Sequence, residues 1–368
     1  MISFYLCIYI QCMRYHFKLV TLYREEREEN MNQSETVLEI KDLCVEFQTV
    51  EGKVQAVDHL SYTLHKSEKL GIVGESGSGK SVSSLAMMQL IPNPPGRVTG
   101  GEILYKGKDL VKLSEKEMRK IRGNEISMIF QEPMTSLNPI IPCGKQIAES
   151  LRLHRSMNKK DAMEEAVKMM KAVGIANPEI RAHEYPHQMS GGMRQRVMIA
   201  MALACQPQIL IADEPTTALD VTIQAQILDL IRDLNREMDT AVLFITHDLG
   251  VVSELCDTVI VMYTGHIVEQ APVKELFRDP KHPYTVGLLN AIPAITKERK
   301  PLQTIAGMVP NPTERIEGCS FWPRCPHATE KCKSKEPPVV SAGEARSVRC
   351  WLYAGEEEET GGPADGEK

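Results

Sequence analysis

The feature that most constrains this chain is an eight-residue run with the pattern G-x-x-x-x-G-K-[ST]. An apolar stretch at 69–73 predicts a strand before the run, and residues 82–90 predict a helix after it. Glycines there let backbone N–H groups turn inward around phosphates, and the helix N-terminus adds partial positive charge. Lys80 should reach the β and γ oxygens, and the Ser81 hydroxyl should bind magnesium. The candidate phosphate-binding residues are Gly74, Glu75, Ser76, Gly77, Ser78, Gly79, Lys80 and Ser81.

Short β-rich runs alternate with helical stretches in the middle of the chain, which predicts an α/β fold with a parallel sheet. Residues 209–212, 242–245 and 259–262 are unbroken apolar runs, as expected of buried parallel strands. From about 144 to 174 the sequence changes to Lys, Glu, Met and Ala at helical spacing. We therefore expect a helical subdomain inserted into the α/β body.

Two acids, Asp213 and Glu214, end the apolar run 209–212. At the end of a strand, Asp213 can hold the magnesium shell through water. Glu214 can face the γ-phosphate and polarise the attacking water. The alternative is a pair of solvated acids that cap a strand. With the phosphate loop upstream, the pair predicts an ATP hydrolase.

A second anion-binding pattern lies at Ser190, Gly191 and Gly192, where an apolar helix running to about residue 204 begins. Free N–H groups and the helix dipole both point outward at such a helix start. One nucleotide does not need two anion sites in the same subunit. The stretch 187–196 resembles the signature sequence of the nucleotide-binding subunits of ABC transporters, which begins Leu-Ser-Gly-Gly-Gln. Met189 and Met193 depart from that signature, while its Ser-Gly-Gly core is intact.

The resemblance covers about residues 37–275 and implies a P-loop NTPase sheet, with the helical subdomain at about 132–190 of a domain spanning 31–275. In this family the signature of one subunit closes over ATP and Mg²⁺ held by the phosphate loop of another. Gln131 resembles the Q-loop glutamine near magnesium, Asp220 belongs to a D-loop-like stretch, and His247 resembles the switch histidine at the γ-phosphate. Phe47 lies where the family often stacks an aromatic ring on adenine; the alternative is a core residue.

Residues 132–139 and the His-Pro-Tyr segment at 282–284 resemble ATPases of oligopeptide, dipeptide and nickel importers. In that family the His-Pro-Tyr segment begins a C-terminal extension, here 276–352. The resemblance implies an ATP-driven motor on the cytoplasmic face of the membrane. Its partners would be two permease subunits, a second related ATPase or a second copy, and indirectly an extracytoplasmic solute-binding protein.

Three alternatives to a peptide importer remain. The chain could serve a nickel or other small-solute importer of the same family, it could be a non-transport ABC ATPase such as a DNA-repair protein, or it could be an interaction module with a degenerate site. The short helical insertion and the net charge of −6, from 43 basic and 49 acidic residues, argue against a nucleic-acid partner. Glu214 and His247 argue against a degenerate site.

The extension holds four cysteines, Cys319, Cys325, Cys332 and Cys350. A reducing compartment favours metal ligation over disulfides. Four thiolates suit zinc or an iron–sulfur cluster equally. The set lacks the close C-x₂₋₄-C pairs of structural zinc sites, and some peptide-importer ATPases resemble this chain in carrying such cysteines around a 4Fe–4S cluster. We expect a 4Fe–4S cluster, with zinc and free thiols as alternatives.

The remaining expectations concern the other cysteines and the chain ends. Cys44, Cys143, Cys205 and Cys256 should be small buried apolar residues. No stretch reaches about 18 apolar residues without a charge, so any membrane role should come through a partner. Residues 24–29 back-translate into a purine-rich run typical of a ribosome-binding site, so we expect 1–30 to be a non-native leader and Met31 the true start. Residues 353–368 should form a disordered acidic tail.

Overall fold

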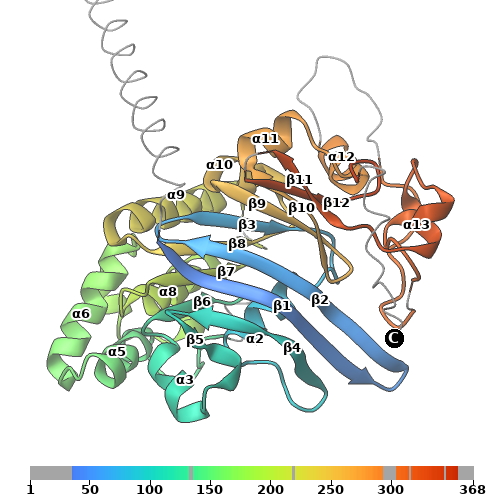
Figure 1. Cartoon of the computed structure of the whole chain (residues 1–368). Helices are drawn as coiled ribbons and strands as arrows, with labels where there is room; N and C mark the ends of the chain where they lie inside the picture. Colours follow the sequence, from blue (N-terminus) through green and yellow to red (C-terminus); the bar gives the residue numbers. More distant parts are fainter. Residues whose placement is uncertain are drawn as a thin grey trace, which may run out of the picture.

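The computed structural model describes residues 35–131, 136–217, 220–292, 304–314, 316–343 and 345–354 (Figure 1). The expectations about the leader 1–30 and about the tail beyond 354 lie outside these residues. So do positions 132–135 of the loop after Gln131 and positions 218–219 of the D-loop-like stretch.

A parallel sheet forms the centre of the molecule, as the sequence predicts. Its strands β9, β3, β8, β7 and β6 are parallel neighbours in that order. Their bounds are Thr258–Tyr263, Lys69–Val73, Ala241–Ile245, Ile209–Asp213 and Ile126–Ile129. Because the strands are parallel, their carboxyl ends meet at one edge, where ligands bind in such sheets.

Three antiparallel strands extend this sheet on the β9 side. β10 (His266–Pro272) pairs with β9, β12 (Arg346–Arg349) pairs with β10, and β11 (Val339–Gly343) forms the edge. The C-terminal extension therefore continues the sheet of the preceding α/β body instead of forming a separate one. Figure 1 shows the orange and red extension elements together at that edge.

A separate four-stranded antiparallel sheet has the order β2-β1-β4-β5. Its strands span Gly52–His65, Thr36–Thr49, Gly96–Tyr105 and Lys108–Asp109. The short helix η1 (Leu110–Lys112) and α3 (Glu115–Ile121) follow it. Figure 1 shows these strands, in blue and cyan, forming a layer beside the parallel sheet.

The alternation of side chains along the parallel strands divides the interior into two cores. In β7, Ile209 and Ile211 pack into the core shared with the antiparallel sheet, α2 (Lys80–Met87) and α3. Leu210 and Ala212 point to the opposite face, into the core formed with helices from the part of the chain after β6. Successive strand residues point to opposite faces, so a strand buried on both sides is apolar throughout.

The remaining helices range from three residues in η2 to 18 residues in α9. Their bounds are α5 Cys143–His154, α6 Lys159–Ala172, α7 Pro178–Arg181, η2 Pro186–Gln188, α8 Gly191–Leu203, α9 Val221–Met238, α10 Leu249–Leu255, α11 Val273–Arg278, α12 Pro283–Asn290, η3 Trp322–Arg324 and α13 Glu330–Ser334. Within the described residues, no helix combines the length and the apolarity needed to cross a bilayer.

Helices α5 and α6 lie in the region of the expected helical insertion, and they pack against each other and against α8. The cap of α6 follows from its sequence, because the Asn158 side chain accepts hydrogen bonds from the N–H groups of Lys160 and Asp161. Met169 and Met170 are buried in the helical core. The methionines of α6 therefore serve core packing.

Candidate active site

The phosphate loop joins β3 to α2 and depends on glycine at defined positions. Gly79 has φ +94°, and a Cβ there would lie 2.3 Å from the Ala56 carbonyl oxygen. Gly74 has φ +154°, and its Cβ would lie 2.2 Å from the Met262 carbonyl oxygen. A side chain at either position would collide with backbone, so the loop can run this close to its neighbours only with glycine.

Lys80 begins α2, and its ammonium group lies over the loop. Its Nζ donates to the carbonyl oxygens of Gly74 at 2.8 Å and Glu75 at 2.9 Å, and to Ser78 Oγ at 3.3 Å. Burial lowers the pKa of Lys80, while the charges of the nearby carboxylates Glu214, Asp213 and Glu75 oppose that shift. The ammonium is therefore a weakly solvated cation at the loop where phosphate is expected.

A hydroxyl and a carboxylate lie together at the start of α2. The Ser81 hydroxyl donates to Asp213 Oδ1 at 2.9 Å. Asp213 is the last residue of β7 and is 5% exposed. Burial raises the pKa of this carboxyl, although the Ser81 hydrogen bond lowers it. Hydroxyl and carboxylate oxygens are hard donors of the kind that Mg²⁺ prefers, so the residues present fit a magnesium ion bound with phosphate.

Glu214 lies at the centre of a second group of polar side chains. Its Oε2 accepts hydrogen bonds from Gln131 Nε2 at 3.0 Å and from Thr217 Oγ1 at 2.9 Å. Its Oε1 lies 3.2 Å from His247 Nδ1. Burial raises the pKa of Glu214, but the hydrogen bonds from Thr217 and His247 outweigh burial and hold it below its ordinary value. Glu214 is therefore ionised at neutral pH.

The backbone of Glu214 is unusual for a residue with a side chain. Its φ is +46°, in the left-handed region, and its N–H donates to the Ile245 carbonyl oxygen at 2.8 Å. Such a conformation costs about 1 kcal/mol or more for a residue with a Cβ. The neighbouring strand β8 thus holds a strained turn that positions the carboxylate at the sheet edge.

The structure brings together Lys80, Ser81, Gln131, Asp213, Glu214 and His247, all from the candidate set. They meet because β3, β6, β7 and β8 are adjacent parallel strands, and each residue lies at the carboxyl end of one of them or in the segment that follows it. The sequence reasoning gave Thr217 no role of its own. The available signal was its position three residues after Glu214. The Thr217 N–H donates to the Glu214 carbonyl oxygen and closes a turn that brings the two side chains together.

Ser190 and Asp220 lie at helix starts apart from this group. Ser190 Oγ accepts from the Met193 N–H of α8 at 3.4 Å, and Asp220 Oδ1 accepts from the Ile223 N–H of α9 at 3.0 Å. Gly191 is exposed, and a Cβ there would have nothing within 4 Å. In the described part of the chain, no hydrogen bond joins Ser190 or Asp220 to Lys80 or Glu214, so both positions stay candidates for contact with another subunit's nucleotide.

Two candidate residues have contacts that the sequence does not indicate. Phe47 of β1 is half-buried, and its ring lies against Gly96 and Ile91 at the edge of the core. This packing is compatible with either interpretation of Phe47. Glu75 is turned away from the loop interior, because its carboxylate pairs with Arg324 and its N–H donates to Tyr284 Oη at 2.9 Å.

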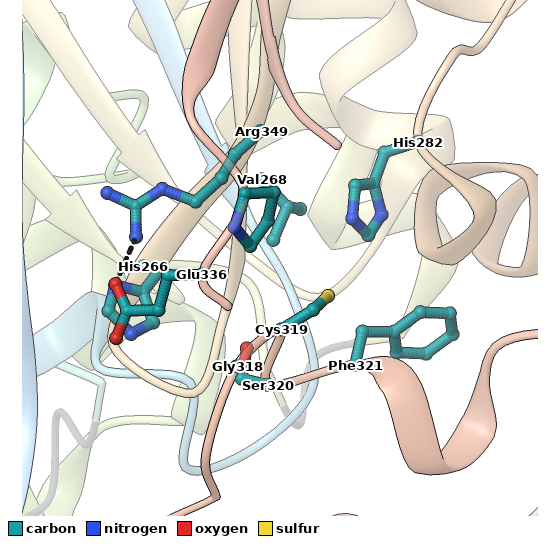
Figure 2. A pocket seen from close by; sticks show the side chains of 10 residues that line it. His266, Val268, His282, Gly318, Cys319, Ser320, Phe321, Glu336 and Arg349 are labelled. Atoms are coloured by element: carbon teal, nitrogen blue, oxygen red, sulfur yellow. Dashed lines mark hydrogen bonds and ion pairs between the residues drawn. The ribbon is translucent and has the colours of Figure 1, made fainter. Parts of the chain in front are cut away.

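The four cysteines of the extension line one cavity of about 150 Å³. It is also lined by His282, His327, Trp322 and Trp351. Burial raises the pKa of the Cys319 thiol to about 11. Figure 2 shows Cys319 beside His282 and Phe321 in a smaller adjoining cavity. The fold therefore brings the four thiols, which are soft metal ligands, to the wall of one cavity. Four thiols that line one cavity are suited to holding either zinc or an iron–sulfur cluster.

The cysteines of the α/β body mostly agree with expectation. Cys143, Cys205 and Cys256 are buried. Cys44 is only partly buried, so the expectation of full burial was wrong for this residue. Its sulfur accepts from the His59 N–H at 3.4 Å where β1 and β2 shift register, because the irregularity opens the strand pair.

Comparison with known families gives two matches in this chain. Residues 57–217 match the ABC transporter family. Residues 268–332 match the family described as the C-terminal region of oligopeptide/dipeptide transporters. The second match includes α12, η3 and three of the four extension cysteines.

The curated relatives are similar along most of their length. The oligopeptide transport ATP-binding protein AppD of Bacillus subtilis is 52% identical over 318 residues, which cover 86% of this chain and 97% of AppD. OppD of Bacillus subtilis is 53% identical over 86% of this chain and 88% of OppD. OppD of Salmonella typhimurium is 50% identical over 86% of this chain and 93% of its own length.

Among solved structures, the chain is similar to the ATP-binding cassette MJ0796, whose dimer was solved in a post-hydrolysis state with ADP and phosphate. The TM-score is 0.58 at 28% identity, with 64% of this chain and 98% of that chain covered.

Proposed function

Because the chain belongs to the oligopeptide transport ATP-binding proteins of the ABC transporters, we propose that it is the ATP-hydrolysing motor of an oligopeptide or dipeptide importer. The observation that carries the proposal is the pair of adjacent groups, Ser81 with Asp213 and Glu214 with Gln131 and His247, beside the phosphate loop. The ATP-binding proteins of this family hydrolyse ATP, and this arrangement supplies the residues for that reaction.

The chemistry follows from the positions of these side chains. Lys80 and the loop bind the phosphates, and Ser81 with Asp213 would hold Mg²⁺, which neutralises developing negative charge. Ionised Glu214 accepts a proton from the attacking water as a general base. Gln131 and His247 orient the Glu214 carboxylate through hydrogen bonds to its two oxygens.

A second subunit completes the site in this proposal. Ser190 and Gly191 at the helix tip are exposed, so the tip is accessible to a nucleotide held by another phosphate loop, while Gly192 is half-buried. The dimeric MJ0796 cassette supports the pairing of such subunits. The partner is a second copy of this chain or a related ATP-binding subunit, and Asp220 belongs to the same interface.

The transporter's membrane subunits are the further partners in this proposal. Ile140 before α5, Leu153 of α5 and Ile180 of α7 are 80%, 72% and 66% exposed. Exposed apolar side chains that form one contiguous patch favour contact with a protein partner. We assign them to contact with two permease subunits at the cytoplasmic face of the membrane, with a solute-binding protein on the far side.

The extension cysteines are assigned to a 4Fe–4S cluster. The support is the cavity that all four thiols line. Anaerobic purification with iron, sulfide and zinc assays tests this assignment. Four irons and four sulfides per chain, lost in Cys325→Ser but retained in the control Cys205→Ser, are expected; stoichiometric zinc, or no metal, contradicts the cluster.

Reconstitution tests the motor function and the substrate. The full chain is co-expressed with its permeases and the related ATP-binding subunit, and phosphate release is measured in vesicles. We expect ATPase activity that increases when binding protein loaded with oligopeptide is added. Stimulation of ATPase activity by nickel instead of peptide supports the small-solute alternative. ATPase activity that is the same with and without the permeases contradicts a transport role.

A further inference from the structure

The phosphate loop is held from outside by two residues of the C-terminal extension. Both oxygens of the Glu75 carboxylate pair with the Arg324 guanidinium, Oε2 with Nη1 at 2.7 Å and Oε1 with Nη2 at 3.1 Å. The Glu75 N–H donates to Tyr284 Oη at 2.9 Å. Arg324 lies 249 positions after Glu75 and Tyr284 lies 209 positions after it.

Glu75 is also one of the groups that hold the loop lysine. Its carbonyl oxygen accepts from Lys80 Nζ at 2.9 Å and from the Ser78 N–H at 3.2 Å. The same residue thus contacts the extension through its side chain and N–H, and the interior of the loop through its carbonyl oxygen. A shift of Glu75 would move the loop backbone that carries the phosphate-binding N–H groups.

Arg324 is itself fixed in position. Its side chain is 4% exposed, its Nε donates to the Ala306 carbonyl oxygen at 3.1 Å, and its guanidinium lies 5.8 Å and 5.9 Å from the ring centres of Tyr263 and Phe321. A bidentate pair between a buried guanidinium and a carboxylate fixes orientation as well as distance. Breaking one partner of such a pair leaves a buried charge unsatisfied.

Tyr284 is the second fixed contact. It is fully buried, and its ring packs against Tyr263 at 4.7 Å and Phe321 at 5.4 Å between centres. These three aromatic residues come from α12, β9 and the turn before η3. The aromatic cluster therefore joins the extension rigidly to the strand that lies beside β3.

We propose that Arg324 and Tyr284 are positioning residues that hold the phosphate loop in the shape that binds ATP. This inference rests on the proposed ATPase role and assigns the extension a part in nucleotide affinity. A loop held in its binding shape before the ligand arrives loses less conformational freedom on binding, so affinity is higher. The contacts do not reach the hydrolytic group around Glu214, so the rate at saturating ATP should be unaffected.

The test measures the dissociation constant of Mg²⁺-ATP for the full chain by calorimetry, together with the melting temperature without nucleotide. Arg324→Met should raise the dissociation constant about tenfold, and Tyr284→Phe, which removes only the hydroxyl, about threefold. Glu75→Gln should act like Arg324→Met, and the double variant should not add to it, because both single changes break the same pair.

Two matched controls separate positioning from general destabilisation. Arg346→Met breaks another buried pair of the extension, with Glu269 at 2.8 Å, that does not touch the loop. Tyr105→Phe removes a buried hydroxyl that donates to Glu125 at 2.9 Å. Both should leave ATP affinity within about twofold of wild type.

The steady-state constants provide the second readout. In the reconstituted transporter, Arg324→Met should raise KM for ATP about tenfold while kcat stays within about twofold. An unchanged dissociation constant in folded Arg324→Met, or an equal rise in Arg346→Met, overturns the inference. A wild-type chain that does not bind ATP at all contradicts the proposed function instead.

Discussion

Replacement of Glu214 by glutamine tests the catalytic assignment most sharply, because glutamine keeps the shape of the side chain. Its carbonyl oxygen can accept from Gln131 Nε2 and Thr217 Oγ1, as Glu214 Oε2 does at 3.0 Å and 2.9 Å. Its amide nitrogen then faces His247 Nδ1, which lies 3.2 Å from the present Oε1. The fold and the binding of ATP should therefore survive.

The loss expected in Glu214→Gln is that of the general base alone. General-base assistance contributes about 10²–10⁴ in rate, which corresponds to about 2.7–5.4 kcal/mol of activation free energy. Because the pKa of Glu214 lies below its ordinary value, the wild-type carboxylate is ionised at neutral pH and the whole of this contribution is present there.

The assay is steady-state phosphate release by the reconstituted transporter, with ATP binding measured separately. We expect kcat to fall by about 10²–10⁴ while KM stays within about twofold. Glu125→Gln, which changes a carboxylate bonded to Tyr105 and Lys106 instead, is the control and should keep full activity. A Glu214→Gln enzyme with kcat within threefold of wild type would refute the assignment of the base.

Three further predictions concern the loop, the magnesium site and pH. In chemical denaturation, Gly79→Ala should lower the free energy of unfolding by about 1–3 kcal/mol more than Gly77→Ala does. Both glycines have positive φ, but only a Cβ on Gly79 would collide with backbone. Equal losses of stability in the two variants contradict the steric argument. Ser81→Ala should raise the Mg²⁺ concentration for half-maximal ATPase activity about tenfold, since the hydroxyl beside Asp213 is lost; an unchanged requirement removes Ser81 from the site. Burial lowers the pKa of His282 to about 3 in the folded chain. Below pH 6.5 the imidazole is therefore protonated in the unfolded chain but stays neutral in the folded chain. The free energy of unfolding should fall as the pH drops from 6.5 toward 3. At pH 5 this amounts to about 2 kcal/mol, and His282→Asn, which can still accept from the Tyr284 N–H, should abolish that slope; an identical slope in both proteins contradicts it.

The candidate residues that meet beside the phosphate loop could be found from sequence because their signals are local. The phosphate loop, the strand ending in Asp213 and Glu214, and the Ser190 helix start each lie within a few consecutive residues. Their assembly follows from a parallel sheet, since strand ends meet at one edge. Such patterns report backbone geometry, which short-range sequence largely determines.

The contacts of the extension could not be predicted in this way. Arg324 and Tyr284 carry no local pattern that indicates Glu75, because the pairing depends on how α12 and η3 pack on β9. Likewise, the spacing of the four cysteines predicts ligation, while the cavity between them depends on folding. Similarly, nothing in the sequence of the short strand β11 indicated that it would pair with β12 and extend the sheet that contains the parallel strands.

The central claim is that ATP joins two ATP-binding subunits, with the phosphate loop of one facing the Ser190 helix tip of the other. Light scattering on the Glu214→Gln chain, alone and mixed with the transporter's related ATP-binding subunit, measures this directly. The claim predicts that Mg²⁺-ATP doubles the mass in at least one of these samples and that Ser190→Arg abolishes the increase. A mass that stays that of separate subunits in both samples at saturating ATP would contradict it.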